Sequence, residues 1–313
     1  MAAEGARPSL LRSWFDRTGW RDLIIGLPYA WLILFFLLPF FIVVGMSLAK
    51  TALSAPPFDF LPAWPYVRFG NYERLFGDSV YIRAYGTSVV NAALTTALCL
   101  LLGYPMALGI TRVNRRWRNI LLMLVILPFW TSFLLRVYAW IGLMGSNSWF
   151  NKGLTALVNA VVPAEWALRS IPLMNTNFAV VLVMVYSYLP FMILPLFANL
   201  EKLDTTLNEA AMDLGSRPWQ VFRDVTFPLS IPGIVAGALL TFIPASGELL
   251  IPNLVGSASS PMIGGVINDE FSSARDWPMA STVAVALLVM LVLPMMAYNH
   301  FEAKAQAAAE AKR

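Results

Sequence analysis

Histidine and cysteine are almost absent from this chain of 313 residues, which has one of each, His300 and Cys99. A single cysteine excludes an intramolecular disulfide and any metal site built from several cysteines. A single histidine argues against metal or haem sites that need several histidines. A membrane anchor of a redox enzyme would need several histidine or cysteine ligands for its cofactor, so the shortage of both residues argues against that function.

Motifs for nucleotide binding and for hydrolysis are also missing. The sequence contains no G-x-x-x-x-G-K-[ST] phosphate loop, no G-x-S-x-G and no H-E-x-x-H. We interpret Gly264-Gly265 as a loop dipeptide only. The chain is therefore not predicted to be an enzyme or to bind a cofactor or metal, and any ATP that drives it must bind to another chain.

Charged residues make up only 13% of the chain, whereas soluble domains carry about 25%. Hydrophobic residues make up 58%, and the mean hydropathy is +0.65. A soluble core cannot bury this much apolar sequence, but a lipid bilayer can. The net charge of +4 is modest and does not suggest a nucleic-acid partner. We predict an all-α integral membrane protein that contacts lipid.

Six apolar runs are long enough to cross a bilayer as helices. We place one transmembrane domain at residues 24–300, between an N-terminal segment (1–23) and a tail (301–313). Pro39 should kink the first span, and Pro190 and Pro195 should break the fourth. The predicted spans are Ile24–Leu48, Tyr85–Ile110, Ile120–Met144, Phe178–Asn199, Ile234–Val255 and Met279–Tyr298.

Lysine and arginine predict the orientation of these spans, because short cytoplasmic loops carry an excess of them. An even number of spans places both termini on one side. That side carries 14 lysine and arginine residues, including four in the link at 111–119, and the opposite side carries seven. We therefore expect both termini, the link and the loop at 200–232 to be cytoplasmic.

The loop at 200–232 is the one long, mixed polar segment between two strongly apolar runs. Its apolar residues have helical spacing and are expected to line one face of a helix. Gly215 stands where a helix C-terminus favours a residue with positive φ, and Ser216 could start a second helix. The alternative is an amphipathic interfacial loop without a partner. The apolar face consists of Leu203, Leu207, Ala210, Ala211 and Leu214.

The spacing of this loop resembles the signature loop of permease subunits in ATP-binding-cassette importers. Glu209-Ala210-Ala211 is followed after three residues by Gly215, and then after nine by Val225-x-Phe227-Pro228, where the family has Ile-x-Leu-Pro. The resemblance implies a coupling helix that docks in a groove of a separate ATPase subunit. The implied coupling residues are Glu209, Ala210, Ala211, Asp213 and Gly215.

Longer stretches resemble the polyamine branch of these permeases, which transports putrescine and spermidine. They include LVILPFWTSFLLRVYAWIG, YLPFMILPLFANLEKLD and IPASGELLIPNLVG. The resemblance implies an inner-membrane importer with four partner chains: a periplasmic polyamine-binding protein, a sister permease and two copies of an ATPase, which would bind ATP and Mg. A transporter encloses its central path between two repeats, and six spans amount to only one of them, so a second, similar permease chain is expected.

Two ionisable residues lie inside predicted spans, Arg136 in the third and Glu248 in the fifth. Such charges are costly in a membrane and are functional candidates, although a structural ion pair or a side chain that snorkels to the interface is an equal alternative. At about 1.5 Å per residue, each lies roughly 23 Å from the cytoplasmic end, so we hypothesise that the two pair in one state of transport and that Glu248 is released to meet the cationic substrate in the other. Pro244 and Gly247 should break the fifth span beside Glu248.

Aromatic residues gather in the outer halves of the third and fourth spans. An interfacial belt is the ordinary interpretation, and a path wall for an organic cation is the sharper one. Two further functions stay open: a permease for another small solute, and a secondary transporter that works alone. The aromatic candidates are Tyr138, Trp140, Tyr186 and Tyr188.

Overall fold

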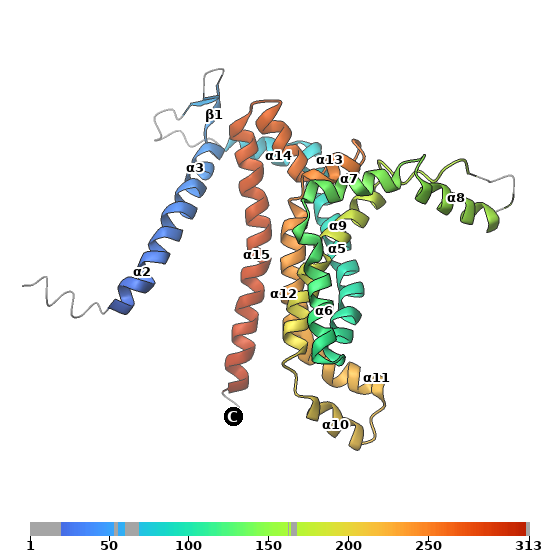
Figure 1. Ribbon diagram of the computed structural model, residues 1–313. Helices are drawn as coiled ribbons and strands as arrows, with labels where there is room; N and C mark the ends of the chain where they lie inside the picture. The colour runs from blue at the N-terminus through green and yellow to red at the C-terminus, as the bar shows by residue number, and fades with distance from the viewer. Residues whose placement is uncertain (1–19, 53–55, 60–68, 162, 164–167, 311–313) are drawn as a thin grey trace, which may run out of the picture.

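The computed structural model describes residues 20–52, 56–59, 69–161, 163 and 168–310. Within these ranges the chain is almost wholly helical (Figure 1). One antiparallel hairpin pairs β1 (Lys50–Thr51) with β2 (Phe58–Asp59). Most of the predicted segment 1–23 lies outside the described residues. The predicted tail at 301–310 continues the last helix rather than forming a separate segment.

Three long helices form the core: α5 (Ser79–Arg112), α9 (Asn177–Leu200) and α12 (Phe227–Ser246). Glycines let α12 approach α9 closely. A Cβ at Gly237 would lie 2.8 Å from the Met192 sulfur, and one at Gly233 would lie 2.6 Å from the Asn199 Cβ. Small residues at helix contacts are typical of membrane proteins, where close packing replaces the hydrophobic effect.

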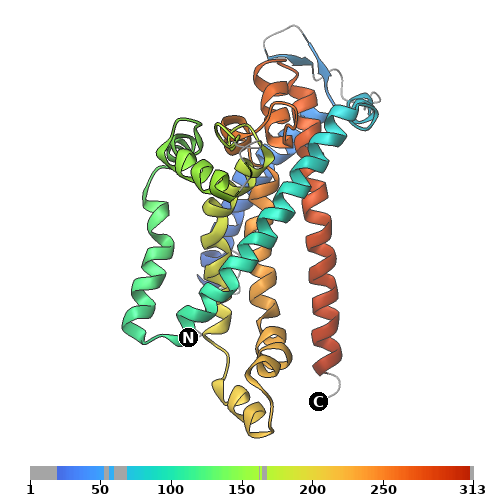
Figure 2. The same ribbon diagram turned by 90° about the vertical axis from the view of Figure 1, so that its right-hand side faces the viewer.

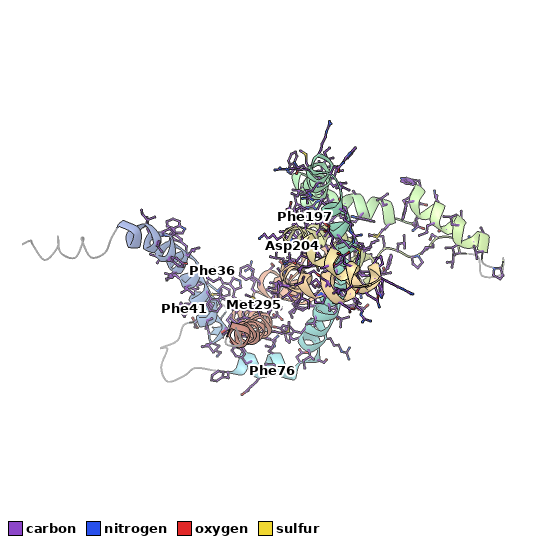
Figure 3. All side chains as sticks on the ribbon, turned by 90° about the horizontal axis from the view of Figure 1, so that it is seen from below. Phe36, Phe41, Phe76, Phe197, Asp204 and Met295 are labelled. Carbon is purple, nitrogen blue, oxygen red and sulfur yellow. The ribbon has the colours of Figure 1, made fainter. Side chains whose placement is uncertain are left out.

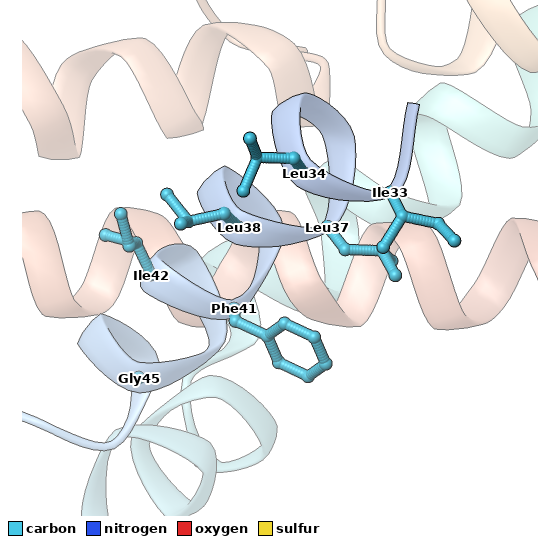
Figure 4. Close-up of a pocket in the computed structure, with 7 residues that line it drawn as sticks. All are labelled: Ile33, Leu34, Leu37, Leu38, Phe41, Ile42 and Gly45. Carbon is cyan, nitrogen blue, oxygen red and sulfur yellow. The ribbon is translucent and has the colours of Figure 1, made fainter. Parts of the chain in front are cut away.

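The first span is one long helix with a π-helical turn. It runs through α2 (Trp20–Leu32), η1 (Ile33–Leu37) and α3 (Leu38–Ser47). Pro39 lies two residues after the π turn and has no N–H to donate, which accounts for the local irregularity predicted there. Only the α3 end packs on α15, and Figure 3 shows Phe36 and Phe41 set apart from the core helices. Figure 4 shows an apolar groove on this helix, lined by Ile33, Leu34, Leu37, Leu38, Phe41, Ile42 and Gly45.

The third predicted span is not straight. It consists of α6 (Arg115–Ile126), a 3-10 turn (η2, Leu127–Trp130) and α7 (Phe133–Met144), and the chain bends by 90° between them. Pro128 removes a backbone donor at the turn, and Thr131 and Ser132 are extended. α8 (Trp149–Val161) follows where the sequence suggested only a loop.

The fourth span, α9, is unbroken, so the prediction that Pro190 and Pro195 would break it is wrong. This helix packs extensively against both α5 and α12. In a membrane, neighbouring helices can compensate for the backbone donors that proline lacks.

The fifth span begins earlier than predicted, at α11 (Pro218–Val221) and a π-helical turn, η4 (Phe222–Thr226), which lead directly into α12. It ends at Ser246, and after three residues α13 (Leu250–Val255) continues the chain. The remaining helices are α4 (Gly70–Gly77), α10 (Thr205–Asp213), α14 (Ile263–Ser272) and α15 (Trp277–Glu310).

Four described helices are long and apolar enough to cross a membrane, or five if the bent α6–α7 pair is one span. The apolar stretch Trp277–Val292 of α15 is shorter. Figures 1 and 2 show two opposite ends of the molecule. The α5–α6 link, α10, α11 and the C-terminal end of α15 lie at the lower end, and the hairpin, α7, α8 and α14 lie at the upper end.

Candidate functional site

The signature loop has the predicted helix, turn, helix form. The Asp204 side chain caps α10 by accepting a hydrogen bond from the Thr206 N–H (2.9 Å), and this interaction lowers the pKa of the Asp204 carboxyl. Gly215 ends the helix with φ +87°, a conformation that side chains other than glycine rarely adopt. The Gly215 N–H donates to Met212 O (2.8 Å), and the Ser216 N–H donates to Ala211 O (3.1 Å).

The second helix of this loop differs from the prediction. It begins at Pro218 rather than at Ser216, and the Arg217 N–H donates to Gln220 Oε1 (2.7 Å). It is also not separate, since it continues through η4 into α12. A hydrogen bond from Thr226 Oγ1 to Asn208 Oδ1 (3.2 Å) ties this continuous helix to α10. This bond joins α10 to the helix that leads into α12.

The surface of the loop is exposed and partly apolar. Glu209, Ala210 and Asp213 are exposed, and Ala211 is half-buried. The predicted apolar face is divided: Leu203 packs against the core, whereas Leu207 is exposed. The most exposed large apolar side chains of this loop are those of Leu214 (88% exposed) and Trp219 (67% exposed). Apolar groups gathered at a projecting loop are typical of an interaction surface.

The fifth span breaks at Gly247, as predicted, whereas Pro244, which was also expected to break it, lies inside α12. The break positions Glu248. One carboxylate oxygen, Oε1, accepts hydrogen bonds from the N–H groups of Leu250 (3.0 Å) and Ile251 (3.4 Å). The other, Oε2, accepts one from the Tyr188 hydroxyl. Glu248 thus caps α13 and binds a tyrosine of α9, which satisfies much of its charge within the chain.

Gly264-Gly265 is not a loop dipeptide. It forms the first turn of α14 and packs against the broken span. A Cβ at Gly264 would lie 2.5 Å from the carbonyl oxygen of Gly247 and 2.8 Å from that of Glu248. The sequence signal was present, since adjacent glycines permit close backbone approach, but nothing in the sequence indicated which backbone they approach.

Arg136 and Glu248 do not pair in this structure. None of the ion pairs between described residues includes either of them. The Arg136 guanidinium lies 5.5 Å from the ring centroids of Phe129 and Phe133, and its Nε is buried without a partner among the described residues. The prediction that Arg136 and Glu248 lie at the same depth in the membrane is wrong. It counted residues along a straight third span, and the chain bends by 90° before Arg136.

The aromatic candidates separate into groups. Trp140 and Tyr186 form a T-shaped contact with centroids 5.5 Å apart, and Tyr188 contacts Glu248. Tyr138 is 56% exposed and has no ring contact within the described part of the chain. The structure therefore brings together Glu248 with Tyr188 and Trp140 with Tyr186, while Arg136 lies among phenylalanines. No group of three or more metal-ligating residues occurs in the described ranges.

Comparison with known protein families gives one match that covers most of this site. Residues 99–306 match the family described as binding-protein-dependent transport system inner membrane component. The matched range includes the signature loop and the break at Glu248.

Similar curated proteins cover most of the chain. The spermidine/putrescine transport system permease protein PotB of Haemophilus influenzae is 36% identical over 89% of this chain and 92% of its own length. PotB of Escherichia coli is 36% identical over 86% and 92%. The inner membrane ABC transporter permease protein YdcU of Escherichia coli is 33% identical over 73% and 74%.

A solved structure has the same fold. A chain of a bacterial ABC transporter that imports the acidic polysaccharide alginate aligns with a TM-score of 0.65, over 94% of this chain and 98% of that one. The identity is 17%, so this likeness concerns the fold alone.

Proposed function

The chain belongs to the binding-protein-dependent transport system inner membrane component family, and we propose that it forms half of the translocation path of an ATP-driven importer for putrescine or spermidine. The observation that supports this choice of substrate is the 36% identity to a spermidine/putrescine permease over 89% of the chain. As a multi-pass inner-membrane transport subunit, it is not itself an enzyme.

Six spans with both termini in the cytoplasm are the topology that we propose. The bent α6–α7 pair would supply the third span, and α15, whose 34 residues exceed the length needed to cross a bilayer, would supply the sixth. The charge distribution supports this orientation, with 14 lysine and arginine residues on one side and seven on the other. The signature loop and the arginine link share one end of the molecule, which agrees with it.

The signature loop is proposed to couple this chain to an ATPase. Support comes from the exposed Leu214 and Trp219 and from the turn at Gly215. Glu209, Ala210, Ala211 and Asp213 would lie at the contact. Because α11 continues into α12, movement of the docked loop would reach the broken span beside Glu248. The partners would be two ATPase subunits, which hold ATP and Mg, a sister permease and a periplasmic polyamine-binding protein.

Glu248 is proposed to receive the cationic substrate. A carboxylate next to a tyrosine, in a broken helix, offers the negative charge and aromatic face that a polyamine requires. Arriving substrate would compete with the Tyr188 hydroxyl for one carboxylate oxygen, while the other stays on the α13 backbone. Trp140, Tyr186 and Tyr138 are candidates for the remaining wall.

The test is transport by the assembled importer in liposomes, with labelled putrescine and spermidine and the soluble binding protein. Glu248→Gln should lose polyamine-stimulated ATPase activity and keep the basal activity. Glu270→Gln is a matched control, since Glu270 accepts a similar tyrosine hydrogen bond, from Tyr81 (2.5 Å), outside the break. Normal polyamine transport by Glu248→Gln would refute the role of Glu248.

Three further outcomes test the alternatives. Uptake of another solute but no polyamine would contradict the substrate, and uptake by this chain alone without ATP would indicate a secondary transporter. Restored function in the double variant Glu248→Gln/Arg136→Gln would indicate a structural pair formed in another state.

A further inference from the structure

A polar cavity lies at the opposite end of the core from the hairpin, where the arginine link meets the root of the signature loop. Its volume is about 300 Å³. Its walls come from the last turn of α5, the start of α6, the end of α9, α10 and η4. The polar lining residues are Thr111, Arg112, Arg118, Glu201, Asn208 and Thr226.

The cavity carries more positive than negative charge. Arg118 Nη1 donates to Glu201 Oε1 (2.6 Å), and Arg118 Nη2 donates to Thr111 O (2.8 Å). A guanidinium has five N–H donors, and the Nε of Arg118 is buried without an acceptor among the described residues. Arg112 is exposed and makes no ion pair or hydrogen bond to the described part of the chain. One carboxylate therefore faces two guanidinium groups.

A further donor faces the same cavity from the signature loop. Asn208 accepts the Thr226 hydroxyl through Oδ1, so its amide NH₂ group is left without an acceptor in the described ranges. Donors from the α5–α6 link and from α10 thus converge on one space, in which Glu201 is the only carboxylate among the described lining residues. Such an arrangement favours an oxyanion, because arginine matches the geometry of phosphate oxygens.

The surroundings indicate where the oxyanion comes from. Arg115 and Arg116 are exposed on the same link, and Trp117 beside them is 60% exposed. Tryptophan is enriched at membrane–water interfaces. Clusters of arginine next to a span, and basic pockets between spans, attract the headgroups of anionic lipids.

We propose that this cavity binds a phosphate group, supplied by the headgroup of an anionic phospholipid, against Arg112 and Arg118. A bound headgroup would bridge the arginine link and α10 and so stabilise the position of α10 at the start of the signature loop. The inference depends on the geometry of this cavity and not on the identity of the transported solute.

The experiment measures lipid binding to the full-length chain by native mass spectrometry, with phosphatidylglycerol and phosphatidylethanolamine as probes. Phosphatidylglycerol should bind more tightly. Arg112→Gln should weaken it about fivefold, since a basic residue near an anionic surface contributes about 1 kcal/mol. Arg112 carries the test, because it has no partner among the described residues whose loss could unfold the chain. Arg223→Gln is the control, since Arg223 is exposed and pairs only with its neighbour Asp224 (2.8 Å).

A parallel titration with inorganic phosphate, in phosphatidylethanolamine nanodiscs, distinguishes the two sources. Weak phosphate binding with tight phosphatidylglycerol binding supports the lipid headgroup. Equal affinity for both supports the phosphate site and overturns the lipid as its source. Equal retention of the two lipids, or unchanged phosphatidylglycerol binding by Arg112→Gln, overturns the proposal.

Discussion

Gly264 is the position at which one added methyl group tests the packing around the helix break. A Cβ there would lie 2.5 Å from the Gly247 carbonyl oxygen and 2.8 Å from that of Glu248. Both are backbone atoms and cannot rotate aside, so α14 and the broken span must separate. Overpacking of this kind costs about 1–3 kcal/mol. Gly264→Ala should therefore destabilise the chain and shift Glu248 relative to Tyr188.

Gly265 provides a control one residue away. A Cβ at Gly265 would meet only the end of a side chain, Asn253 Oδ1, at 3.1 Å. Replacing glycine by alanine in a helix also contributes up to about 1 kcal/mol of favourable propensity, and both variants share this term. Their difference isolates the steric effect, so Gly264→Ala should be about 1–3 kcal/mol less stable than Gly265→Ala.

The measurement is reversible unfolding of the two variants and the parent chain in mixed micelles, followed by circular dichroism. Polyamine uptake by the reconstituted importer is the second readout, and it should fall for Gly264→Ala only. Equal stability and equal uptake of the two alanine variants would refute the close packing at Gly264 and its role in positioning Glu248.

Three further predictions concern the signature loop and the topology. Gly215→Pro should abolish uptake without preventing membrane insertion, because proline cannot adopt the φ of +87° found at Gly215. Glu209→Lys should have the same effect, because it reverses the charge at the proposed contact. Normal uptake by both variants would contradict the coupling role. Cysteine at Ser259 should react with an impermeant thiol reagent outside spheroplasts, whereas cysteine at Asn114 should not, and the reverse pattern would overturn the orientation. Because the pKa of Asp204 is lowered in the folded chain, its cap should stabilise α10 at pH values above the ordinary carboxyl pKa of 3.8, and this stabilisation should be lost as the pH falls through the lowered pKa. The loss should appear as faster amide hydrogen exchange in α10. An exchange rate that does not depend on pH, after correction for the intrinsic rate, would contradict this prediction.

The sequence was informative where a local rule decides the structure. Gly215 has positive φ because a helix that ends in a tight turn requires it there, and spacing alone located that turn. The break at Gly247 was likewise local, since a glycine after Pro244 weakens the helix. Apolar composition predicted a helical membrane protein because unpaired backbone groups are not tolerated in lipid.

Local rules failed where neighbouring helices decide the outcome. The same residue type, proline, interrupts the helix at Pro128 and leaves it continuous at Pro190 and Pro195. α9 is packed between α5 and α12 in the core, whereas α6 has no buried residue and the chain can turn there. The depth of Arg136 could not be counted along the sequence for this reason.

Composition and short-range backbone geometry suffice to predict the class of the protein, its apolar helices and the signature turn. What Glu248 contacts depends on tertiary packing. Tyr188, which donates to its carboxylate, lies on α9, and Gly264, which approaches its carbonyl, lies on α14. The α13 backbone that it caps is instead a local neighbour. Contacts between distant segments depend on how helices bend and cross, and no spacing along the chain encodes those angles.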